Sequence, residues 1–159
     1  MSEPKFIPKP GQVDYTNIRY CPTINCIIKC NDEFLLLKRS PDLNLYPGLW
    51  NGVSGFLDDH QDIQDKVREE LKEELNILED KISSIKVFNP FYIEGKEYDK
   101  TWIVFPVLVE INSKDLKIDF EHSEYKWFKI DEYQNIAKSY KIISDIPMIL
   151  NIVFSNKQL

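Results

Sequence analysis

The segment from Asp62 to Ile77 constrains the fold of this chain more than any other stretch of its sequence. It reads DIQDKVREELKEELNI, and bulky apolar residues recur in it at every fourth position, namely Ile63, Val67, Leu71 and Leu75. This spacing predicts a helix with one apolar stripe that is buried against the rest of the protein. Asp62 can cap the start of that helix, because its carboxylate can accept a hydrogen bond from a free backbone N–H.

The rest of the sequence predicts strands and helices in mixed order. Strands are expected at residues 23–29, 33–39, 50–57, 82–93, 101–111 and 125–130, and further helices at 131–137 and 146–154. This order lacks the regular strand–helix alternation of a doubly wound fold and predicts an α/β (α+β) sandwich. Pro106 lies within the fifth of these strands and predicts a sheet edge or a bulge at that point.

The first twelve residues contain residue types that disfavour helices and sheet ladders, namely Pro4, Pro8, Pro10 and Gly11. They predict an extended N-terminal arm at 1–12, which leaves 13–159 as a single domain. The length of 159 residues is ordinary for one domain. Three cysteines, an odd number, lie in an apolar segment that includes the first predicted strand (Cys21, Cys26, Cys30). We therefore expect reduced and mostly buried thiols rather than a disulfide framework.

The charge balance argues against one class of partner. The chain has 20 Lys and Arg against 26 Asp and Glu, a net charge of −6, whereas proteins that bind a nucleic-acid polymer carry basic surfaces. A phosphorylated small molecule is compatible with this charge if a metal ion supplies the positive charge. The sequence shows no apolar signal segment near its start and no apolar run of about 18 residues. We therefore expect a cytoplasmic protein without a membrane partner.

The predicted helix carries three glutamates that crowd one of its faces. At about 100° per residue, Glu70, Glu73 and Glu74 share an arc of about 100°. Two of them lie in the last turn, where the helix dipole disfavours negative charge, and like charges four residues apart repel. A divalent cation would turn this repulsion into attraction, because hard cations take several carboxylate oxygens. The alternative is a solvated, charged helix face.

The segment in front of the helix supports the metal interpretation. Gly52 and Gly55 interrupt a short apolar strand, and a loop leads from this strand directly into the helix. Glycines allow a backbone to approach a ligand closely. Together, residues 55–77 resemble the signature of the Nudix hydrolase family, G-x5-E-x7-R-E-U-x-E-E-x-G-U, in which U is a bulky apolar residue. Gly55 matches the first glycine, and the intact acidic positions are Glu70, Glu73 and Glu74.

The resemblance implies a Nudix-type α/β/α sandwich with a mixed β-sheet. It also implies a pyrophosphohydrolase that uses Mg²⁺ or Mn²⁺ to cleave the diphosphate bond of a nucleoside diphosphate linked to another moiety. Three signature positions differ here: Gln61 replaces the first glutamate, Glu69 the arginine, and Asn76 the second glycine. In the family, that glutamate and arginine usually support the geometry of the loop and helix, so their absence requires a rebuilt support. Dimers are common in the family, so a homodimer stays open.

The resemblance also assigns site residues. Glu70 and Glu74 would bind the metal, and Glu73 would bind metal or orient the attacking water. The backbone carbonyl of Ser54 would complete the metal site. Apart from the resemblance, Arg39 is a candidate for contact with a substrate phosphate, and the alternative is a surface cation that pairs with the acidic helix. Nudix enzymes often take a further glutamate from a later loop. Glu124 is our first choice as catalytic base, and the second choice is Glu121, at the substrate.

Other interpretations remain open from the sequence. His122 is an alternative base, and five aromatic residues could stack on a nucleobase or fill the core, namely Tyr46, Trp50, Phe91, Tyr92 and Tyr98. Gln61 and Glu69 favour a catalytically weak, Nudix-like nucleotide-binding module. An isomerase acting on isopentenyl diphosphate needs a cysteine at the substrate, whereas the cysteines here precede the signature. The sequence contains no motif that selects one nucleoside diphosphate derivative.

Overall fold

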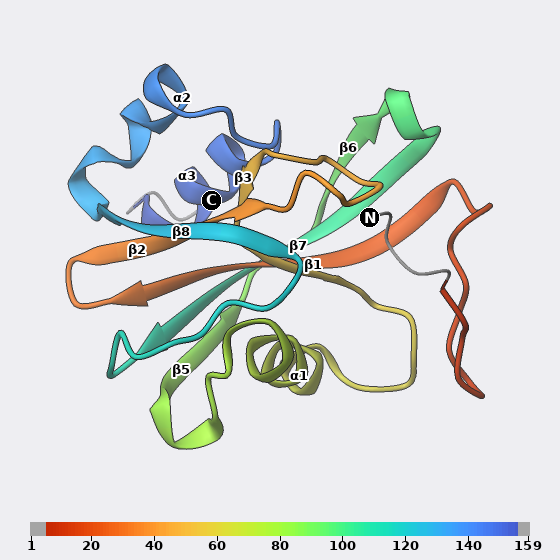
Figure 1. Ribbon diagram of the computed structural model, residues 1–159, viewed down its shortest axis with the longest axis horizontal. Coiled ribbons are helices and arrows are strands. Elements are labelled where there is room, and N and C mark those ends of the chain that lie inside the picture. Colours follow the sequence, from red (N-terminus) through yellow and green to blue (C-terminus); the bar gives the residue numbers. More distant parts are fainter. Residues whose placement is uncertain (1–5, 156–159) are drawn as a thin grey trace.

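Two long strands pair in parallel at the centre of the structure, β1 (Tyr20–Cys30) and β7 (Lys100–Ile111). The computed structural model describes residues 6–155 (Figure 1). The other strands all pair antiparallel and are β2 (Glu33–Arg39), β3 (Trp50–Asn51), β4 (Val53–Phe56), β5 (Ile82–Val87), β6 (Phe91–Gly95) and β8 (His122–Lys129). The sheet is therefore mixed, which confirms the predicted fold class.

Each central strand exchanges one neighbour for another along its length. The first half of β1 pairs with β4 and its end pairs with β2, while β7 pairs first with β6 and then with β5. The helices are α1 (Ile63–Leu75), α2 (Ile136–Ser139) and α3 (Ile146–Phe154), with short 3₁₀ turns at Glu79–Lys81, Lys96–Tyr98 and Ile130–Asn135. Figure 1 shows α1 below the sheet and α2 and α3 above it, which gives three layers.

Alternate residues of the central strands fill two cores, one on each face of the sheet. On one face, Ile24, Cys26 and Ile28 of β1 pack with the apolar stripe of α1. On the other, Ile27 packs with α3. The three cysteines are free and buried, as predicted.

Helix α1 begins and ends as its sequence predicts. The Asp62 carboxylate accepts a hydrogen bond of 2.8 Å from the backbone N–H of Asp65. Asn76 ends the helix in the left-handed conformation with φ of 54°. The next N–H, that of Ile77, returns to the carbonyl of Leu71 at 3.1 Å. Asparagine tolerates this conformation, so its replacement of the signature glycine leaves the cap intact.

Two predicted strands are divided in the structure. Residues 82–93 form β5 and β6 with a break at 88–90, where Pro90 has no N–H to donate. Pro106 does not lie on a sheet edge, since β7 has neighbours on both sides, but it faces this break and accepts a hydrogen bond of 2.9 Å from Phe88. Residues 50–57 are divided at Gly52, where a Cβ would lie 2.4 Å from Oδ1 of Asn25.

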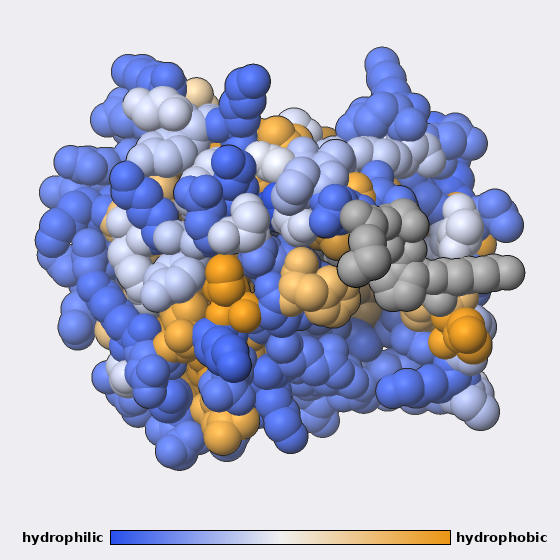
Figure 2. All heavy atoms as spheres, in the orientation of Figure 1, coloured by the Kyte–Doolittle hydropathy of each residue, from blue (hydrophilic) through white to orange (hydrophobic). Residues whose placement is uncertain are grey.

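The chain before β1 crosses the surface without forming a strand or helix in residues 6–19. The predicted arm at 1–12 lies partly outside the described residues, which also exclude 156–159. Within residues 6–155, no helix combines the length and apolar character needed to cross a bilayer. The face of the molecule in Figure 2 is mainly hydrophilic, with its hydrophobic side chains in small groups.

Candidate active site

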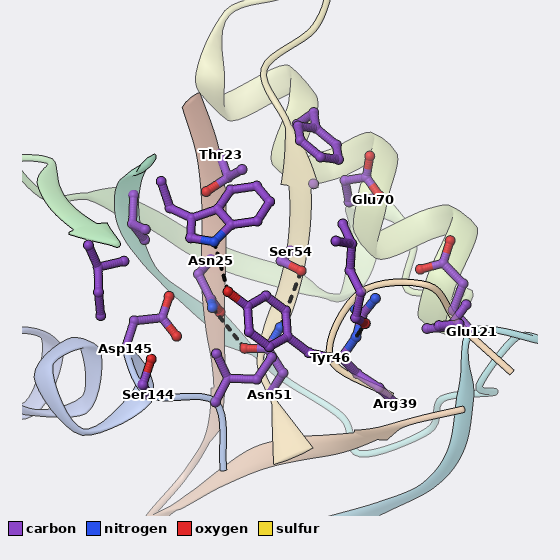
Figure 3. A pocket seen from close by; sticks show the side chains of 18 of the residues that line it. Thr23, Asn25, Arg39, Tyr46, Asn51, Ser54, Glu70, Glu121, Ser144 and Asp145 are labelled. Atoms are coloured by element: carbon purple, nitrogen blue, oxygen red, sulfur yellow. Dashed lines mark hydrogen bonds between the residues drawn. The ribbon is translucent and has the colours of Figure 1, made fainter. Parts of the chain in front are cut away.

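A cavity of about 290 Å³ lies beside the first half of β1 and one side of α1. Figure 3 shows Glu70, Glu121 and Arg39 on one side of this cavity, and Ser144 and Asp145 on the other. Of the site residues predicted from the sequence, Arg39, Ser54, Glu70 and Glu121 line it. The structure thus brings residues from four separate segments to one place.

The carboxylate of Glu70 lies against the backbone of β4. A Cβ built on Gly55 would approach Cδ and Oε1 of Glu70 to 2.8 Å, a distance that real contacts do not show. The glycine at this position therefore creates the space in which the carboxylate sits. Burial is the main cause that raises the pKa of Glu70 to about 7, and the nearby charge of Glu73 adds to it.

Glu74 lies one turn further along α1 and is only 3% exposed. Its Oε2 has no hydrogen-bond partner among the described residues, and its Oε1 lies 3.6 Å from Nε2 of His122. Burial, followed by the charges of Glu121 and Glu70, raises the pKa of Glu74 well above its usual range. A buried carboxylate with a free oxygen and acidic neighbours is a position where a cation would relieve an electrostatic cost.

His122, the alternative base, is buried beside Glu74. It is 5% exposed, and its Nδ1 lies 3.3 Å from Oδ1 of Asp119. The ring therefore lies between Asp119 and Glu74, where it can orient the Glu74 carboxylate.

Glu73 is exposed on the same helix, next to the pair. Partial burial and the charge of Glu69 raise its pKa. Its side chain can turn toward solvent, so it is less fixed than Glu70 and Glu74.

The two candidate glutamates of the later loop have different surroundings. Glu121 lines the cavity, and burial and the charge of Asp119 raise its pKa, although Arg39 counteracts them. The side chain of Glu124 is 57% exposed and lies 3.8 Å from Nζ of Lys38, outside the cavity lining. The structure therefore brings Glu121 to the carboxylate cluster and leaves Glu124 on the surface of β8.

Arg39 is held at the mouth of the cavity by the backbone. Its Nε donates to the carbonyl of Leu45 at 2.9 Å, which fixes the guanidinium beside Glu121. On β4, the Ser54 hydroxyl accepts a hydrogen bond of 3.2 Å from Nδ2 of Asn51.

The acidic cluster fits a hard divalent cation by its chemistry. Its donors are carboxylate oxygens, and one of them is buried without a partner. The described residues contain no set of three or more acidic, His or Cys side chains already drawn together around one point.

Two of the three altered signature residues, Gln61 and Glu69, contact each other. Nε2 of Gln61 donates to Oε2 of Glu69 at 2.8 Å, so the pair has exchanged donor and acceptor compared with the family pattern. Nζ of Lys66 lies 3.4 Å from the same oxygen, and it binds Oδ1 of Asp58 at 2.8 Å and Oδ2 of Asp59 at 3.3 Å. The loop before α1 is thus tied to the helix by a lysine instead of an arginine.

The role of Lys66 in this connection was not predicted from the sequence. The lysine is 5% exposed, and although burial acts to lower its pKa, the carboxylate of Asp58 and the other acidic neighbours raise it overall. The sequence does contain an indication of this role. Glu69 stands where the signature has an arginine, so an acidic region has lost a cation, and another basic side chain nearby is needed to balance its charge.

Replacing Lys66 with methionine is expected to destabilise the protein. The variant would leave Asp58 buried and unpaired, which costs about 3–5 kcal/mol when one partner of a buried ion pair is removed. Urea unfolding at neutral pH measures this loss, with Lys72→Met, an exposed lysine of α1, as the matched control. Equal stability of the two variants would show that Lys66 does not hold the loop.

The raised pKa of Glu70 predicts that stability falls as pH rises. The folded-state pKa of about 7 exceeds the ordinary value of 4.5, so the folded protein retains a proton that the unfolded chain releases. In EDTA, the contribution of Glu70 to the unfolding free energy should be complete below about pH 4.5 and should decrease by on the order of 2 kcal/mol as pH rises through 7. Urea titrations across this range should show a shallower decrease for Glu70→Gln. An identical slope in both proteins would contradict the prediction.

Known proteins are similar to this chain in sequence and in fold. Residues 19–146 match the NUDIX domain. The chain is 26% identical over 118 residues to the nucleoside triphosphatase NudI of Escherichia coli O81 (strain ED1a), a match that covers 69% of this chain and 83% of that protein.

Solved structures show the same fold. The MutT protein from Methanosarcina mazei Go1 is similar with a TM-score of 0.70 and 20% identity, over 89% of this chain and 99% of that one. An Ap4A hydrolase of C. elegans is similar with a TM-score of 0.62 and 22% identity, over 82% and 93%. Because the matched domain spans most of the sequence, this protein belongs to the Nudix hydrolase family.

Proposed function

We propose that this Nudix hydrolase cleaves the diphosphate bond of a nucleoside diphosphate derivative with the help of Mg²⁺ or Mn²⁺. The observation that carries the proposal is a pair of neighbouring carboxylates, the half-buried Glu70 that lines the cavity and the buried Glu74, which has an oxygen without a hydrogen-bond partner among the described residues. The similar proteins named above, a nucleoside triphosphatase and an Ap4A hydrolase, support a nucleotide substrate.

Glu70 and Glu74 are the residues that would hold the cation, and Glu73 adds a flexible carboxylate. By family resemblance, the backbone carbonyl of Ser54 would be a further ligand. When bound, the cation would neutralise diphosphate charge and lower the pKa of a water molecule. The protein contributes fixed carboxylates, and burial keeps them from being fully solvated before the ion binds.

Glu121 is our choice for the residue that orients the attacking water and accepts its proton. It lines the cavity and lies close enough to Glu74 to raise its pKa, whereas Glu124 faces solvent. A carboxyl with a raised pKa is a better proton acceptor near neutral pH than an ordinary one. Arg39, fixed beside Glu121, would bind a substrate phosphate.

The alternative is a catalytically weak binding module, which the altered Gln61 and Glu69 favoured in the sequence. Lys66 and the hydrogen bond between Gln61 and Glu69 rebuild a connection between loop and helix. This observation favours the hydrolase over the binding module.

Replacing Glu74 with glutamine should remove most of the activity, because it removes the most buried carboxylate. The assay is phosphate release, coupled to a phosphatase, from nucleoside triphosphates, ADP-ribose and dinucleoside polyphosphates with Mg²⁺ or Mn²⁺. We expect kcat/KM to fall by about a hundredfold or more. Glu132→Gln, an exposed glutamate distant from the cavity lining, is the matched control. Metal-dependent turnover that survives in Glu74→Gln would reject this role.

The two loop glutamates can be separated with a second pair of variants. Glu121→Gln should lower kcat by about a hundredfold with a small change in KM, because a proton acceptor acts in the chemical step. Glu124→Gln should stay within about threefold of the wild type, since it loses only an exposed ion pair with Lys38. The reverse order of the two effects would restore Glu124 as the base.

A further inference from the structure

The end of the cavity away from the glutamates has a chemistry of its own. Asp145 and Ser144 lie there, with Tyr46 between them and Arg39 in Figure 3. Trp102, which is hydrogen-bonded to Tyr46, and Ile143, which precedes Ser144, also line the cavity. This end therefore combines flat, apolar surfaces with one acidic group, which is the composition of a selective small-molecule subsite.

Asp145 is placed as the N-cap of α3, yet its side chain makes no capping hydrogen bond. The residue is 7% exposed, and Oδ1 has no hydrogen-bond partner among the described residues. The described residues also supply no ion pair to this carboxylate. Since a buried polar atom without a partner is costly, a ligand with N–H groups would satisfy it.

The carboxylate is an acceptor under ordinary assay conditions. Burial raises the pKa of Asp145 to about 6, while its own N–H and the Asn25 amide act in the opposite direction. Above pH 7 it is therefore ionised and can only accept hydrogen bonds. Nδ2 of Asn25 is already bound to Oδ1 of Asn51 at 2.8 Å, which fixes the floor of the cavity next to Asp145.

Hydrogen bonds hold the two aromatic side chains of this part of the cavity, Tyr46 and Trp102, in fixed positions. Nε1 of Trp102 donates to the Tyr46 hydroxyl at 2.8 Å, and the backbone N–H of Tyr46 donates to the Tyr98 hydroxyl at 2.7 Å. A Cβ on Gly95 would lie 2.4 Å from Nε1 of Trp102, so the backbone closes tightly behind the indole. Rigid aromatic groups at a pocket wall can stack on a planar base with little loss of entropy.

We propose that this end of the cavity binds a guanine base, with the Asp145 carboxylate accepting hydrogen bonds from the ring N–H and the adjacent amino group. Guanine places two donors side by side, which matches the two oxygens of a carboxylate. Adenine and cytosine place a donor beside an acceptor, and uracil places one donor between two acceptors. The inference rests on the proposed function, because the phosphates would then extend toward Arg39 and Glu70.

The wild-type protein tests this without any hydrolysis. The probes are GMP, IMP and AMP, and the readout is the dissociation constant from calorimetry, repeated in Glu74→Gln. IMP lacks only the amino group of GMP. We expect GMP to bind at least about tenfold more tightly than IMP or AMP, because a hydrogen bond to a charged group is lost with each of the others. Equal affinities, a preference for AMP, or no binding of GMP would overturn the inference.

The variant Asp145→Asn assigns the effect to the carboxylate. It should remove the preference of GMP over IMP and AMP, whereas Asp131→Asn, an exposed aspartate at the start of another helical turn, should keep it. A retained preference in folded Asp145→Asn, checked by thermal unfolding, would overturn the role of Asp145. The wild-type series stands even if this variant does not fold.

The experiments give different results depending on whether the hydrolase proposal or the guanine subsite is wrong. Hydrolysis without a guanine preference leaves the proposed function intact and rejects the base subsite. A guanine preference in a protein that hydrolyses nothing supports the subsite and rejects the proposed function.

Discussion

The placement of two glutamates on α1, Glu74 buried and Glu70 half-buried, is the constraint on which the rest of the site depends. Glu70 and Glu74 repel each other and have raised pKa values, so the helix would avoid this arrangement if it stood alone. The stripe of Val67, Leu71 and Leu75, each fully buried against the sheet, holds the helix in place. The packing of the apolar face of α1 thus holds the two glutamates together on its other side, at an electrostatic cost that the proposed cation would relieve.

The sequence predicts those parts of the fold that follow from local periodicity. The bounds of β2 and α3 agree with the prediction to the residue, and α1 begins after its predicted cap. Residues 82–93 were less predictable, because Pro90 divides an apolar run whose two halves pair with different parts of β7. The alternation of apolar and polar residues shows which face of a strand is buried, but it does not show which other strand it will pair with.

The candidate site was most predictable where its residues share one helix or follow the signature, and least where two neighbouring loop residues compete for one place. Glu70 and Glu74 followed from spacing, whereas the choice between Glu121 and Glu124 depended on a bulge. Lys38 pairs with Glu124 and Arg39 pairs with His122, so one residue of β8 is skipped and the side-chain alternation changes there. The roles of Lys66 and Asp145 became visible only through tertiary contacts.

The exchange of donor and acceptor between Gln61 and Glu69 also shows that both residues of a signature pair can change while the hydrogen bond between their positions is kept.

The parallel pairing of β1 and β7 has a consequence for how the site comes into being. Tyr20 pairs with Thr101, so about 80 residues of chain must close into a loop before the sheet has its centre. The cavity takes walls from both strands and from the segments between and beyond them. No fragment of the chain can therefore carry the site alone, and during synthesis the pocket is complete only after nearly all of the domain has emerged.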